Sequence, residues 1–112
     1  MNERLRQSLR DIVKLLVARK YTELEALTKG VRLSASEMAQ AVDCYGRQLV
    51  APPDNAFEFL DAVEVRNMQP SRWSVTMPLW TQEEGRSDLS LEVTLIDRKQ
   101  AIEIELDDIH VL

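Results

Sequence analysis

The alternation of apolar and polar residues is most regular in the last quarter of the chain. Between Asp88 and Asp97 every second residue is apolar, which is typical of a strand with one buried and one solvated face. After a polar turn at residues 97–100 the alternation resumes, so the two segments predict an antiparallel hairpin. Its apolar positions are Leu89, Leu91, Val93, Leu95, Ile102, Ile104 and Leu106.

The second strand of this hairpin loses its phase near its end. Asp108 stands where an apolar residue is due, and Ile109 and Val111 take the opposite parity. A slip of one residue turns every following side chain to the other face of a sheet. The strand is therefore predicted to bulge, bend or end near Asp107 and Asp108.

Helical periodicity marks the N-terminal part. Residues 3–19 carry apolar side chains at the spacing of one helical face, which predicts an amphipathic helix packed on a core. Two shorter helices are predicted from capping boxes at residues 22–25 and 34–37, with Gly30 and Gly46 as left-handed stops. The apolar stripe of the first helix is Leu5, Leu9, Ile12, Val13, Leu16 and Val17.

Two consecutive prolines, Pro52 and Pro53, separate these helices from the strands. A first strand is predicted at Val63 and a second at residues 71–80. The second contains Pro78, whose missing amide hydrogen requires an edge, a bulge or the end of a strand.

The order of elements predicts the α+β class, with three N-terminal helices packed on one face of a four-stranded antiparallel meander. The length of 112 residues predicts a single domain, 1–112, with a helical part at 1–50 and a sheet part at 56–112. No apolar run approaches the roughly 20 residues that span a bilayer, and residues 1–4 lack the features of a secretory signal. We therefore expect no membrane insertion and a cytoplasmic location, with which the single Cys44 agrees.

Charge divides the chain into two unlike parts. Of the 14 basic and 19 acidic residues, nine bases and six acids lie in residues 1–50, a net charge of +3. Residues 51–112 hold five bases and thirteen acids, a net charge of −8. The overall charge of −5 argues against nucleic acid as a partner, since such binding needs clustered Lys and Arg.

Two resemblances accompany these patterns. The order of elements and residues 16–27 resemble the start of nuclear-transport-factor-2-like, cystatin-related domains, in which a curved antiparallel sheet wraps over helices. The enzymes of that class commonly hold an Asp, or an Asp and His pair, in a cone-shaped pocket, whereas this chain has one His near its C-terminus. A second resemblance rests on six short segments, which are Tyr45–Arg47, Pro52–Pro53, Trp73–Val75, Pro78–Thr81, Glu84–Leu89 and Asp107–Leu112. In these segments the chain resembles a family of small bacterial cytoplasmic proteins of unknown function, and the resemblance implies no activity.

The sequence Asp107-Asp108-Ile109-His110 is the most suggestive group of polar residues. Carboxylates and an imidazole can bind a divalent metal or act as an acid and base pair. On a regular strand Asp108 and His110 share a face and Asp107 points away, which leaves two ligands where zinc needs three or four. We therefore predict no metal and no cofactor, and a structural role for Asp108 and His110 near a bulge stands beside a binding role.

Two further surfaces are candidates for binding. The solvated side of the hairpin carries Asp88, Glu92, Glu103 and Glu105, which can attract a basic protein or calcium, or simply keep the sheet soluble. Trp80 is predicted on the face opposite Trp73, where it can pack at a strand edge or form an interface. No nucleophile elbow, phosphate-binding glycine loop or zinc ribbon is present in the sequence.

These observations favour a small non-enzymatic binding protein whose acidic sheet face meets a protein partner or a second copy of the chain. An immunity-type protein that neutralises a basic toxin is one concrete form. The alternative is a nuclear-transport-factor-2-like pocket protein or enzyme that binds a small molecule between sheet and helices.

Overall fold

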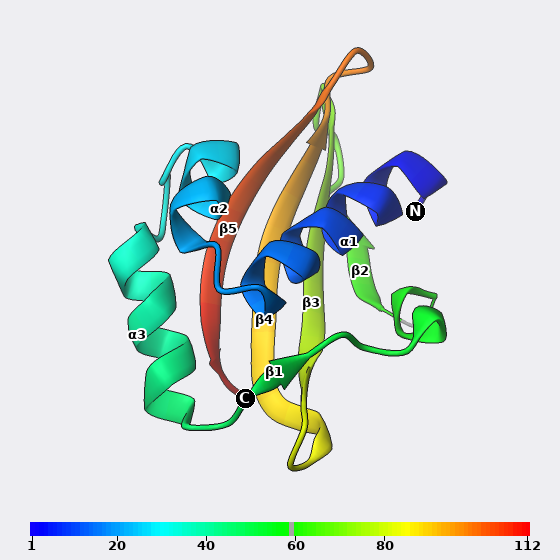
Figure 1. Cartoon of the computed structure of the whole chain (residues 1–112). Helices are drawn as coiled ribbons and strands as arrows, with labels where there is room; N and C mark the ends of the chain where they lie inside the picture. The colour runs from blue at the N-terminus through cyan, green and yellow to red at the C-terminus, as the bar shows by residue number, and fades with distance from the viewer. Residues whose placement is uncertain (59) are drawn as a thin grey trace.

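The computed structural model describes residues 1–58 and 60–112 and shows an α+β fold, in which three helices precede an antiparallel sheet (Figure 1). This confirms the predicted fold class. The helices are α1 (Glu3–Val17), α2 (Tyr21–Thr28) and α3 (Ala35–Tyr45), and a short 3-10 helix, η1 (Asp54–Phe57), lies between the first two strands. The strands are β1 (Leu49–Val50), β2 (Asp61–Glu64), β3 (Ser71–Thr81), β4 (Gly85–Asp97) and β5 (Ile102–Val111).

Helix α1 lies across the sheet because its apolar stripe matches the sheet's apolar face. The predicted residues from Leu5 to Leu16 are buried, whereas Val17 is only partly so. Asn2 caps the helix, since its side-chain oxygen accepts a hydrogen bond from the Leu5 amide at 3.0 Å. In Figure 1, α1 crosses in front of the strands, whereas α2 and α3 lie along β5, so α1 covers one face of the sheet and the other two helices flank its β5 side.

One of the two predicted capping boxes is present. The Ser34 hydroxyl accepts from the Glu37 amide, and the Glu37 carboxylate accepts from the Ser34 amide, as the sequence predicted. The box predicted at Thr22 is wrong, because α2 already begins at Tyr21 and its N-cap, Lys20, makes no side-chain hydrogen bond. The tight link from α1, with a hydrogen bond from the Lys20 amide to the Leu15 carbonyl, leaves no extended residue to act as a cap.

The sheet has one strand more than the sequence predicted. The order is β1-β3-β4-β5, and β2 also pairs with β3, so β1 and β2 share one edge of β3. Strand β1 has only two residues and therefore no periodicity to detect. Val63 was expected to begin a strand and lies in β2, but it is 59% exposed. The β2 residue that packs against the core is Ala62, because the register pairs it with Val75.

Both predicted irregularities of the strands are present as shifts of the pairing register. The pairing of β3 with β4 shifts between Pro78 and Trp80, which face Ser90 and Arg86, so the additional residues of this shift lie in β4. The pairing of β4 with β5 shifts between Glu92 and Val93, which face Asp108 and Leu106 respectively. Asp107 is therefore the extra residue of a β-bulge.

The sheet face turned away from the helices is called the outer face below. Its residues pair with one another across the strands and alternate with the core residues. They are Arg72, Ser74, Thr76, Pro78, Ser90, Glu92, Thr94, Ile96, Glu103, Glu105, Asp108 and His110. Among the described residues, no helix has the length and apolar character needed to cross a membrane.

Candidate functional site

The bulge in β5 brings three polar side chains together on the outer face. Glu92 in β4 pairs directly with Asp108, and His110 follows two residues later along β5. One potential ligand atom from each of the three residues lies within 4.8 Å of the other two. His110 Nε2 is 3.2 Å from Glu92 Oε1, and His110 Nδ1 is 3.8 Å from Asp108 Oδ2. We call these three residues the Glu92–Asp108–His110 cluster.

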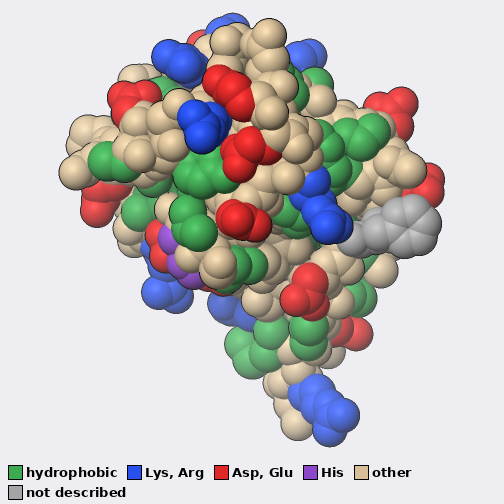
Figure 2. All heavy atoms as spheres, turned by 90° about the horizontal axis from the view of Figure 1, so that it is seen from below, with side chains coloured by type: hydrophobic (Ala, Val, Ile, Leu, Met, Phe, Trp, Pro, Cys, Tyr) green, Lys and Arg blue, Asp and Glu red, His purple; other side chains and the backbone are tan. Residues whose placement is uncertain are grey.

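The cluster is half-exposed, yet part of it is tightly held. The side chains of Glu92, Asp108 and His110 are 35%, 47% and 39% exposed. Asp108 Oδ1 accepts a hydrogen bond of 2.9 Å from the Ile109 amide, which leaves Oδ2 on the side of the imidazole. His110 Nε2 is buried and has no hydrogen-bond partner, despite its short contact with Glu92. Figure 2 shows the histidine atoms (purple) at the surface, with acidic and basic atoms beside them.

Asp107 does not point to the opposite face, as it would on a regular strand. Its Oδ2 accepts a hydrogen bond of 2.7 Å from the hydroxyl of Thr94, an outer-face residue. Its Oδ1 lies 3.0 Å from Nε of Arg32, in the loop between α2 and α3. The expectation failed because the extra residue of a bulge lets two successive side chains lie on the same side of a strand.

The other predicted acidic residues lie on the same face but outside the cluster. Glu103 accepts a hydrogen bond from Arg98, and this bond lowers the pKa of the Glu103 carboxyl, with smaller contributions from nearby positive charges. Glu105 pairs with Thr94 in the register between β4 and β5. Among the ion pairs of the described residues, none joins Glu92, Glu105 or Asp108 to an Arg or a Lys.

Trp80 lies near the end of β3, between Val50 of β1 and Arg86 of β4, and not with the cluster. It is half-buried and packs against the core. Together with Pro78 and Arg86 it lines a cavity of about 190 Å³, which Asn55 and Ala56 of η1 complete. The η1 segment therefore lies beside the part of β3 that neither β1 nor β2 pairs with. Trp73 also packs against the core, so each tryptophan has a packing role.

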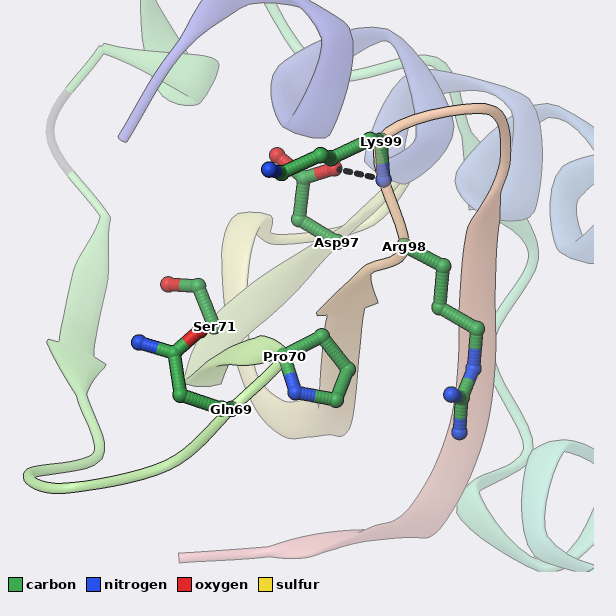
Figure 3. A pocket seen from close by; sticks show the side chains of 6 residues that line it. All are labelled: Gln69, Pro70, Ser71, Asp97, Arg98 and Lys99. Carbon is green, nitrogen blue, oxygen red and sulfur yellow. Dashed lines mark hydrogen bonds between the residues drawn. The ribbon is translucent and has the colours of Figure 1, made fainter.

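Two larger hollows were not predicted from the sequence. One, of about 440 Å³, lies between α1 and residues 51–57; Val13, Val17, Pro52 and Phe57 are among its apolar lining residues, and Arg10 and Lys14 are among its polar ones. The other, of about 400 Å³, lies between two turns of the sheet (Figure 3). There Asp97 accepts a hydrogen bond from the Lys99 amide, and the Arg98 side chain points away from Asp97. Neither hollow contains a residue of the cluster.

The arrangement of the cluster allows two kinds of chemistry. An imidazole between two carboxylates can take up a proton, or all three groups can coordinate a cation. The sequence pointed to Asp108 and His110 together and to Glu92 separately, but it did not join them. The missing signal lay in the turn at residues 98–101 taken together with the broken phase near Asp108. The register from the turn alone would set Glu92 opposite Asp107, and the extra residue of the bulge moves the pairing to Asp108.

Comparisons with known proteins place the chain in a family whose function is unknown. No curated protein and no solved structure matches the chain. Residues 13–112 match the family described as a domain of unknown function (DUF7668). The match includes every strand and leaves out only the first part of α1 and the residues before it. The chain therefore belongs to the family of this domain of unknown function, DUF7668.

Proposed function

We propose that this protein is a non-enzymatic binding protein whose outer face binds a basic surface of a protein partner. The observation that supports this proposal is a set of carboxylates on neighbouring strands that pair with no Lys or Arg among the residues that the structure describes. Glu92 and Asp108 lie directly opposite each other, and Glu105 lies on the same face. Like charges opposite one another on paired strands destabilise a sheet, so a basic partner would relieve a repulsion that the free protein bears.

The distribution of charge along the chain agrees with this use of the sheet. The excess of acidic residues belongs to residues 51–112, which form every strand except β1. Helix α1 covers the other side of the sheet, so the outer face is free to meet a partner (Figure 1). A basic toxin neutralised by this chain is one partner of the required chemistry, and a second copy of the chain is a poorer one because the two acidic faces would repel each other.

The test is capture of partners from the cells that make the protein, with two charge-reversed variants beside the wild type. The first variant carries Glu92→Lys, Glu103→Lys and Glu105→Lys on the outer face. The matched control carries Glu23→Lys, Asp43→Lys and Glu58→Lys, which change the net charge equally at exposed positions outside that face. Thermal unfolding first establishes that both variants are folded.

We expect the outer-face variant to lose a partner that the control variant retains. We also expect the wild-type complex to weaken as salt rises, because salt screens exposed charges. The proposal fails if both variants retain the same partners, or if both lose them equally.

A second candidate function is the binding of a small molecule, which the hollow between α1 and residues 51–57 favours. Its volume of about 440 Å³ is within the range of ligand sites, and its lining combines apolar side chains with Arg10 and Lys14. It lies beside α1, away from the expected position between sheet and helices. A fragment screen by NMR tests this function: Val13→Trp should fill the hollow and abolish binding there, whereas an unchanged set of binding fragments would exclude the hollow as their site.

A further inference from the structure

The Glu92–Asp108–His110 cluster has the donor set of a metal site. It offers one imidazole nitrogen and two carboxylates from adjacent strands, and their candidate ligand atoms lie within 4.8 Å of one another. A short side-chain adjustment brings three such atoms to the distances of about 2.0–2.2 Å that zinc has to nitrogen and oxygen. The sequence alone indicated two possible metal ligands, Asp108 and His110. The structure adds a third, because Glu92 of β4 lies opposite Asp108.

The details of the cluster suit the binding of a cation. Among the described residues, His110 Nε2 is a buried atom that makes no hydrogen bond, and a Glu92 carboxylate oxygen lies 3.2 Å from it. Asp108 is already oriented, because its Oδ1 accepts from the Ile109 amide while Oδ2 lies toward the imidazole. Such a second hydrogen bond is typical of carboxylates that bind metals. A cation between Glu92 and Asp108 would also cancel the repulsion between them.

We propose that Glu92, Asp108 and His110 bind a divalent first-row transition-metal ion on the outer face. The imidazole favours zinc, copper, iron or nickel over calcium and magnesium, which prefer ligand sets made of oxygen atoms. Three protein ligands leave at least one coordination position for water or for a group from another molecule. This proposal goes beyond the binding of a protein partner and stands without it, because it concerns the isolated chain.

The experiment is titration of the purified full chain with zinc after removal of metals by a chelator. The exposed Cys44 is changed to Ser in every sample so that a thiol does not supply the signal. Calorimetry compares this background with Glu92→Gln, Asp108→Asn and His110→Gln. The control is Glu105→Gln, which removes a carboxylate of the same face and strand from outside the cluster.

We expect one zinc ion per chain, a loss of affinity of about tenfold or more in each cluster variant, and no change in the control. The thermal midpoint should rise with zinc in the background and the control, and not in the cluster variants. Absence of binding by the background protein would overturn the proposal. An equal loss in Glu105→Gln would also overturn it, because the effect would then come from general charge.

A spectroscopic measurement separates metal binding from protonation of the same imidazole. The chain contains one histidine, so its two ring nitrogens give unambiguous signals in long-range ¹H–¹⁵N spectra. Zinc at constant pH should shift one ring nitrogen and fix the tautomer. If both nitrogens are unchanged at saturating zinc, His110 is not a ligand and the proposal fails. A failure of partner capture leaves these metal measurements unaffected, so the two proposals are tested separately.

Discussion

Arg32 and Asp107 form an ion pair that joins the loop between α2 and α3 to the bulge in β5, with 3.0 Å between Nε and Oδ1. Asp107 also accepts the hydrogen bond from Thr94 on the neighbouring strand. One carboxylate therefore connects the helical layer to two strands at the irregular position that orients the cluster.

Asp107→Ala should destabilise the protein more than Arg32→Ala. Loss of Arg32 removes one exposed ion pair, which contributes about 0.5 kcal/mol. Loss of Asp107 also removes a hydrogen bond to a charged group, so we expect about 1.5–3 kcal/mol. Urea unfolding of the two variants and of the double variant checks this order. A larger effect for Arg32→Ala would show that the loop, and not the hydrogen bond to Thr94, holds the bulge.

Ser87 is predicted to stabilise the irregular pairing of β3 with β4, because it is one of the three β4 residues that face Leu79 there. It is buried, and its hydroxyl donates to the Leu79 carbonyl at 2.8 Å and accepts from the Leu89 amide at 3.2 Å. Ser87→Ala leaves both backbone groups without this partner and should cost about 1–3 kcal/mol in chemical unfolding. Ser74→Ala is the control, because Ser74 is exposed. Equal unfolding midpoints for the two variants would refute this role for Ser87.

The two capping boxes predicted from the sequence should behave differently on mutation. Ser34→Ala removes a side-chain cap and should lower the free energy of unfolding by about 1 kcal/mol. Thr22→Ala should change it by less than about 0.5 kcal/mol, because Thr22 lies inside the first turn of α2 and is exposed. Denaturation curves of the two variants under the same conditions measure this difference. An equal loss of unfolding free energy in Thr22→Ala and Ser34→Ala would contradict the structure.

Acid should destabilise the protein through three surface carboxyl groups. The pKa of Glu103 is lowered by its hydrogen bond with Arg98, that of Asp97 by the Lys99 amide and that of Glu37 by Ser34. A folded-state pKa below the unfolded value gives stability that is present above the unfolded pKa and is lost as pH falls through the folded pKa. The ordinary values are 4.5 for Glu and 3.8 for Asp, so the free energy of unfolding should fall as pH drops below about 5.

Unfolding with urea between pH 6 and about pH 3 measures this dependence. Glu103→Gln should make the free energy of unfolding depend less on pH, because it removes a carboxyl group whose pKa differs between the folded and unfolded states. Glu58→Gln serves as the matched control at an exposed position away from these hydrogen bonds. An unchanged slope in Glu103→Gln would mean that the pair with Arg98 does not contribute in solution.

The sequence predicted the elements whose signals are local. Alternation in β4 and the first part of β5 identified the core-facing side chains, and the broken phase at Asp108 located the bulge. Ser34 and Glu37 could be recognised because the capping box lies within four residues. The single-domain prediction and the cytoplasmic location stay predictions.

What the sequence did not provide depends on distances between segments far apart in the chain. Strand β1 exists only because Leu49 and Val50 meet the end of β3. The cluster needs the register that places Glu92 opposite Asp108, and Arg32 reaches Asp107 from a loop whose position is set by helix packing. Such relationships follow from the three-dimensional arrangement, so a candidate site seen as two residues in the sequence became a cluster of three.

The position of α1 has a consequence for synthesis of the chain. Arg4 donates to Asp97 and to the Lys99 carbonyl, so the start of α1 meets a turn that is made more than ninety residues later. The apolar stripe of α1 packs on a sheet whose central strand begins at Gly85. During translation this stripe has no sheet to cover it until β3 and β4 have emerged from the ribosome. The nascent chain therefore exposes the apolar stripe of α1 until these strands have been made, and in that interval it is open to chaperones and to aggregation.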